Sequence, residues 1–115
     1  MTDTTAENAT ETARRETLAR QAIKNGFNME DEDSGAAMFV AFHLEELDAG
    51  YWREHLKTGR PAPGSVLDLL VLREHWGGPD ELEHFDFALP GEVSDYVVSV
   101  RFDEDGKVAE ISMES

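Results

Sequence analysis

The 115-residue chain contains no cysteine, which excludes a disulfide framework, a cysteine-based zinc site and a thiol nucleophile. No run approaches the 18 consecutive apolar residues that a transmembrane helix needs. The opening segment, MTDTTAENATETA, lacks the basic and apolar regions of a signal peptide. We therefore expect a soluble, untargeted protein, and the lack of cysteine is consistent with a cytoplasmic location.

The motifs of the common enzyme classes are also missing. None of the serines lies in a G-x-S-x-G nucleophile motif. Gly77 and Gly78 are followed by proline rather than by the Lys-Ser or Lys-Thr pair of a phosphate-binding loop. Carboxylate pairs are expected by chance in so acidic a chain, so none of them identifies a general acid. The sequence therefore predicts no enzymatic activity and no cofactor.

Basic residues are scarce: the chain has 25 acidic and 10 basic residues, and its formal net charge is −15. Residues 65–115 alone carry 13 acidic and 3 basic residues. Such a surface repels phosphate backbones and anionic membranes, so we expect no direct binding to nucleic acid or membrane. It attracts a basic protein, although the simpler interpretation is that the charge only keeps the chain soluble.

The N-terminal half is predicted to be helical. Residues 1–10 have no apolar periodicity and are expected to form a disordered acidic tail, followed by a single domain over residues 11–115. A first helix is predicted from Glu11 to Asn25, with Gly26 as its stop.

A second helix is predicted in the segment AAMFVAFHLEELDAG, capped by Asp33 or Ser34 and ended by Gly50. It is the most apolar helix of the chain, so we expect it to be the central packing helix. Its predicted apolar face consists of Met38, Phe39, Ala41, Phe42 and Leu47.

The later elements are predicted in chain order as a short helix over 51–59, a helix over 65–70 and strands over 71–76, 83–89, 95–102 and 107–115. The alternation predicts that one face of the second strand carries Phe85, Phe87 and Leu89, and that one face of the third carries Tyr96, Val98, Val100 and Phe102. The last strand is expected to place Val108 on the face opposite Ala109, Ile111 and Met113. Helices followed by consecutive strands predict an α+β fold, in which the helices pack on one face of an antiparallel meander of three to four strands.

The stretch Asp103-Glu104-Asp105-Gly106 raises the question of a cation site. A calcium-binding EF-hand loop with Gly106 at its sixth position would begin at Arg101 and end at Ser112, where a bidentate glutamate is needed. Asp-Gly between two alternating segments is instead a strong hairpin signal. The stretch is therefore predicted to be a turn.

Three segments, HLEEL (43–47), FDF (85–87) and SDYVVSVRFDEDGKVAEISMES (94–115), resemble an uncharacterised bacterial family known as domain of unknown function two-thousand-and-four. The resemblance extends over about residues 38–115. The chain departs from the family pattern in its shorter N-terminal portion and in VLREHWGGPD (71–80), which replaces a more apolar strand. The resemblance implies an α+β fold and a small cytosolic protein, and it supplies no catalytic residues.

Our leading hypothesis is a non-enzymatic interaction protein whose acidic β-face docks a basic partner, in an immunity-like, accessory or regulatory role. The residues assigned to partner binding are Trp76, Asp80, Glu81, Asp103, Glu104 and Asp105. Tyr51 and Trp52 are more often core residues at such a position, whereas Trp76 beside a Gly-Gly turn is expected to be exposed. A homodimer joined through a sheet edge or the Tyr51–Trp52 helix end is a further hypothesis.

The alternative hypothesis is a small metal- or ligand-binding enzyme. If Arg73 pairs with Asp86 across a hairpin, His75 lies opposite His84. Two histidines and a carboxylate on one sheet face can hold a divalent ion, and the same geometry occurs in solvated polar pairs without metal. The residues of this hypothesis are His75, His84 and Asp86.

Overall fold

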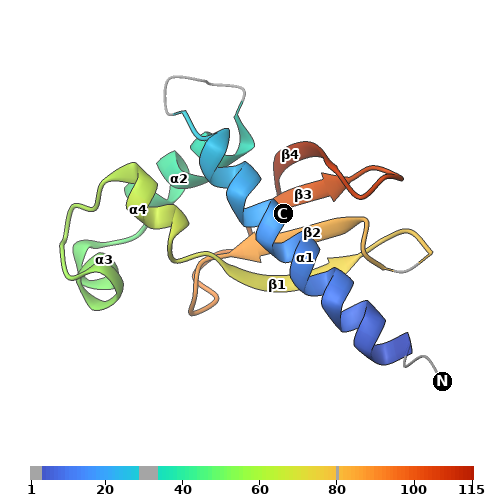
Figure 1. The fold of residues 1–115 in the computed structure, drawn as a ribbon. Helices are drawn as coiled ribbons and strands as arrows, with labels where there is room; N and C mark the ends of the chain where they lie inside the picture. The colour runs from blue at the N-terminus through green and yellow to red at the C-terminus, as the bar shows by residue number, and fades with distance from the viewer. Residues whose placement is uncertain (1–3, 29–33, 80) are drawn as a thin grey trace.

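The computed structural model describes residues 4–28, 34–79 and 81–115. In these residues four helices precede four strands, in the order α1 (Thr4–Asn25), α2 (Gly35–Glu46), α3 (Ala49–Leu56), α4 (Pro63–Leu67), β1 (Val71–Trp76), β2 (His84–Ala88), β3 (Val97–Phe102) and β4 (Val108–Glu114) (Figure 1). The strands form one antiparallel sheet in chain order. The predicted α+β fold with a meander is confirmed.

The first helix, α1, begins at Thr4 instead of Glu11. Residues 4–10, which the sequence placed in a disordered tail, are therefore its first turns, and residues 1–3 lie outside the described residues. Neither glycine nor proline interrupts residues 4–25, so nothing in this segment stops the helix from extending toward the N-terminus. The helix ends at Asn25, as predicted.

Helix α1 lies across the sheet although its apolar stripe is narrow (Figure 1). Ala19 and Ile23 are fully buried in the core. The guanidinium of Arg15 lies 5.3 Å from the ring centre of Phe102, and that of Arg20 lies 5.0 Å from the ring centre of Phe87. Arginine side chains placed over aromatic rings thus widen the face that the helix presents to the sheet.

Helix α2 begins as predicted but ends earlier. The Ser34 hydroxyl accepts a hydrogen bond from the amide of Ala37, so Ser34 is the N-cap. The expected stop at Gly50 is wrong, because Asp48 caps a new helix by accepting from the Tyr51 amide and Gly50 lies inside α3. An N-cap residue fixes the start of a helix, so the chain turns between α2 and α3.

The buried face of α2 differs from the predicted one. Phe39 is buried, but Met38 is 45% exposed and Ala41 is exposed. A Cβ on Gly35 would lie 2.7 Å from the Cα atom of Ser112, so the helix approaches the β4 backbone too closely for any side chain there. This contact sets the rotation of α2, and its buried residues are Gly35, Ala36, Ala37, Phe39, Val40 and His43.

The core lies on the face of the sheet that packs against the helices. Every helix contributes buried side chains to it, including Trp52 of α3 and Val66 of α4. The strands contribute alternate residues, namely Phe85, Phe87, Val98, Val100 and Phe102, with Ile111 and Met113 partly buried beside them. The predicted core alternation of β2 and β3 is thus confirmed.

A β-bulge in β4 corrects the prediction for Val108. Arg101 pairs with Glu110, but Phe102 pairs with Val108, so β4 has one extra residue at Ala109. An extra residue reverses the facing of the residues beyond it. Val108 therefore packs against the core with Ile111, and the expected opposite placement is wrong.

Candidate functional site

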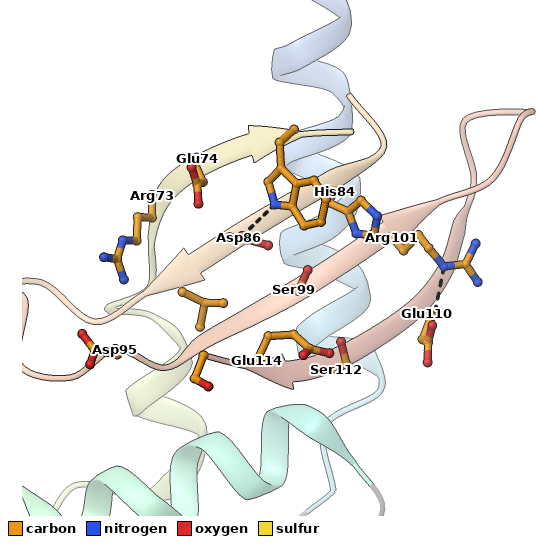
Figure 2. A pocket seen from close by; sticks show the side chains of 13 residues that line it. Arg73, Glu74, His84, Asp86, Asp95, Ser99, Arg101, Glu110, Ser112 and Glu114 are labelled. Carbon is orange, nitrogen blue, oxygen red and sulfur yellow. Dashed lines mark hydrogen bonds and ion pairs between the residues drawn. The ribbon is translucent and has the colours of Figure 1, made fainter. Parts of the chain in front are cut away.

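The face of the sheet opposite the core is hollowed into an open cavity of about 640 Å³. We call this surface the open face, and Figure 2 looks onto it with α1 behind the sheet. It is lined by Arg73, Glu74, Trp76, His84, Asp86, Asp95, Val97, Ser99, Arg101, Glu110, Ser112, Glu114 and Ser115. Five of these side chains are carboxylates and two are guanidiniums, so the open face is acidic.

The alternation of the strands explains this composition. In β4, Glu110, Ser112 and Glu114 alternate with the core-facing residues, and in β3 the corresponding positions are Val97, Ser99 and Arg101. The Nε atom of Arg101 lies 3.5 Å from a carboxylate oxygen of Glu110, its cross-strand partner (Figure 2). One of the two guanidiniums is therefore already paired with a carboxylate of the same face.

Asp86 occupies the middle of β2 and is only 7% exposed. One of its oxygens, Oδ2, accepts a hydrogen bond of 2.9 Å from the indole nitrogen of Trp76. The other, Oδ1, is buried and has no hydrogen-bond partner among the residues that the structure describes. Buried polar atoms are nearly always hydrogen-bonded, so an orphaned carboxylate oxygen marks a position that favours an additional donor.

Trp76 is 46% exposed, which confirms the prediction that it is exposed. Trp52 is buried in the core, the placement that the sequence favoured for it. The indole ring of Trp76 stacks on the imidazole of His84, with ring centres 4.1 Å apart and planes within 11°. Trp76 and His84 are cross-strand partners, so the two rings form one wall of the open face.

The structure does not bring the three residues of the metal hypothesis together. The expected register holds where Leu72 pairs with Phe87, but Arg73 is an extra residue in β1, so Glu74 rather than Arg73 pairs with Asp86. This bulge turns His75 to the other face of the sheet, where it stacks on Phe85.

The Nδ1 atom of His75 also lies 2.8 Å from the carbonyl oxygen of Glu81. His84 and Asp86 do share the open face, as predicted from their spacing. Within the described residues no group of three or more histidine or acidic side chains is arranged to hold a metal ion. The predicted alignment of His75 with His84 is wrong.

The residues assigned to partner binding that the structure describes gather at one end of the sheet. The β1–β2 and β3–β4 turns lie at this end (Figure 1). Between them, the amide of Phe102 donates a hydrogen bond to the carbonyl of Glu83. Glu81 lies in the first turn, and Asp103, Glu104 and Asp105 lie in the second. Asp80 lies outside the described residues.

The Asp103–Gly106 stretch is a hairpin turn, as predicted. One oxygen of Asp103 accepts hydrogen bonds from the amides of Lys107 and Asp105, and these bonds lower the pKa of Asp103. Gly106 has a φ of +76°, which favours glycine. Asp103 thus stabilises its own turn, while the side chains of Glu104 and Asp105 are exposed.

Sequence reasoning missed four acidic residues of the open face, namely Glu74, Asp95, Glu110 and Glu114. Glu110 and Glu114 carry a detectable signal, because they alternate with Ile111 and Met113. Glu74 has no such signal, because the bulge at Arg73 decides which face of the sheet its side chain lies on.

No family model, curated protein or solved structure matches this chain. The resemblance of residues 38–115 to the family named above therefore stays a prediction. Among the described helices, none is long and apolar enough to cross a membrane.

Proposed function

We propose that the protein is a non-enzymatic interaction module whose open face docks a basic surface of a partner protein. The observation that carries this proposal is the composition of the hollow: five carboxylates, two guanidiniums and a half-exposed tryptophan around one concave sheet face. Complementary charge steers such partners together and fixes their register. A partner whose own function depends on its basic surface would be inhibited or regulated by this contact.

Two features of the open face favour docking over a purely solubilising role. Trp76 presents a large aromatic surface to solvent, and tryptophan is enriched among the residues that dominate binding energy. The carboxylates also line a concavity rather than a convex surface, so a protruding basic segment contacts several of them at once.

A titration of isotope-labelled protein with defined peptides tests the proposal. Three peptides of equal length, one rich in lysine and arginine, one neutral and one acidic, are added while backbone amide resonances are recorded. We expect saturable shifts with the basic peptide alone, concentrated in β1, β2, β3 and β4, which line the open face. Raising the salt concentration from about 50 mM to about 500 mM should weaken binding at least about tenfold, because salt screens the attraction between exposed charges.

A matched pair of double variants separates the open face from net charge. Glu110→Gln with Glu114→Gln removes two carboxylates from the open face, and Glu45→Gln with Glu46→Gln removes two exposed carboxylates from α2. The first pair should weaken binding of the basic peptide several-fold more than the second. Equal effects, shifts confined to the helices, or no binding of the basic peptide would overturn the proposal.

A further inference from the structure

The open face contains a second carboxylate next to Asp86. Glu74 is the cross-strand partner of Asp86, and both side chains line the hollow. Like charges directly opposite each other on a sheet repel, which makes this pairing unfavourable unless a cation lies between them. Among the described residues no basic side chain forms an ion pair with either carboxylate.

The nearest arginine in sequence does not fill this role. Arg73 is the bulged residue of β1, and Figure 2 shows its guanidinium directed away from Asp86. Within residues 4–28, 34–79 and 81–115, the buried oxygen Oδ1 of Asp86 thus has no donor. An isolated buried carboxylate oxygen and an adjacent exposed carboxylate together favour a cationic donor from another molecule.

We propose that the Glu74–Asp86 pair, together with the indole of Trp76, receives one arginine side chain of the basic partner. The inference rests on the proposed docking function and adds the chemistry of its central contact. A guanidinium is planar and carries five N–H donors, so it can donate to both carboxylates while its plane stacks on an indole. An ammonium group is a compact, strongly hydrated charge and does not stack in this way.

Entry of the guanidinium requires Trp76 to move. Oδ1 of Asp86 is buried, and the indole nitrogen of Trp76 occupies Oδ2 of the same carboxylate. Trp76 is the last residue of the edge strand β1, so its ring can swing outward without breaking the ladder between central strands. The incoming guanidinium then replaces the indole N–H as donor to Asp86.

Three peptides that differ at one central position test this contact by calorimetry. The position carries arginine, lysine or citrulline, which has nearly the shape of arginine but no charge. We expect the arginine peptide to bind about tenfold more tightly than the lysine peptide, and the citrulline peptide to bind more weakly than both. Binding of arginine should also change the fluorescence of Trp76, and Trp76→Phe should abolish this change while the signal of buried Trp52 remains.

The variants Asp86→Asn, Glu74→Gln and Glu114→Gln each remove one negative charge from the open face. Asparagine keeps an oxygen that accepts from the indole, so Asp86→Asn is expected to fold. The first two should each weaken arginine binding about tenfold and erase the preference for arginine over lysine. Glu114 lies on β4, two strands away from Asp86 in the sheet. Glu114→Gln should therefore weaken arginine binding only about two- to threefold and keep the preference for arginine over lysine.

Failure of the inference is distinguishable from failure of the docking function. If arginine and lysine peptides bind equally and the three variants weaken binding equally, the arginine site is overturned and docking of a basic partner stands. If wild-type protein binds neither peptide, both proposals are overturned. Should Asp86→Asn fail to fold, the exposed position Glu74 decides the question alone, and an unchanged preference in Glu74→Gln overturns the arginine site.

Discussion

The buried imidazole of His43 joins helix α2 to the loop before β3 through the hydroxyl of Ser94. Nδ1 lies 2.7 Å from the carbonyl oxygen of Phe39, and Nε2 lies 2.6 Å from Oγ of Ser94, 51 residues away in sequence. A carbonyl oxygen can only accept, so Nδ1 carries the proton. In the neutral ring Nε2 then accepts from the Ser94 hydroxyl, and both ring nitrogens are satisfied.

The stability of the protein should fall as the pH drops below about 6.5. Burial lowers the pKa of His43 below its ordinary value of 6.5, so the unfolded chain takes up a proton in a range where the folded chain does not. The free energy of unfolding therefore decreases with falling pH and levels off below the folded-state pKa. Urea denaturation between about pH 8 and pH 5 measures this slope, and His43→Gln should flatten it; an unchanged slope in that variant would contradict the assignment.

Replacing Ser94 with alanine should destabilise the fold by about 1–3 kcal/mol, because the Nε2 atom of buried His43 then loses the hydroxyl that donates to it. Ser65→Ala is the control. Ser65 lies inside α4, which begins at Pro63 with Ala62 as N-cap and no side-chain cap, so its hydroxyl does not cap the helix. The control should change the unfolding free energy by less than about 0.5 kcal/mol. Similar losses in both variants would show that the His43–Ser94 bond contributes nothing measurable.

Gly35→Ala should cost about 1–3 kcal/mol, since the new methyl group meets the backbone of Ser112 at 2.7 Å and backbone atoms cannot move aside cheaply. Gly64→Ala is the opposite case. A methyl group there meets no atom within 4 Å, and the position lies inside α4, so alanine should be neutral or stabilise by up to about 1 kcal/mol. Thermal and urea denaturation of both variants check the contrast, and equal stabilities would refute the packing argument.

The positions of the four strands could be predicted from sequence, but the sheet face on which each side chain lies could be predicted only in part. Alternation in residues 83–89 and 95–102 identified the core-facing phenylalanines and valines correctly. His75 was misplaced because the bulge at Arg73 shifts the register by one residue. A single extra residue reverses every later side chain, and it leaves the apolar pattern nearly unchanged.

The candidate site was only partly predictable for the same reason. Trp76 and Asp86 were singled out from the sequence, but in different hypotheses. Their hydrogen bond depends on the shifted register, in which the cross-strand partner of His84 is Trp76 and not, as predicted, His75. The rotation of α2 was likewise set by the close approach at Gly35, a tertiary contact that periodicity does not encode.

Two neighbouring arginines of α1 should respond differently to lysine substitution. Arg15 donates to the carbonyl of Leu82 at 2.7 Å and lies over the ring of Phe102, and its side chain is 17% exposed. Arg14 shares the carboxylate of Glu11 with Arg15 but is 48% exposed. Lysine keeps the charge and loses the planar stack, so Arg15→Lys should destabilise the fold by about 1–2 kcal/mol and Arg14→Lys should have little effect.

Denaturation at low and high salt measures the unfolding free energy of both variants. The loss in Arg15→Lys should persist at high salt because the stacking and carbonyl contacts are partly buried. A loss that vanished at high salt would mean that the ion pair with Glu11 carries the effect and that α1 is not held to the sheet by the arginine contacts.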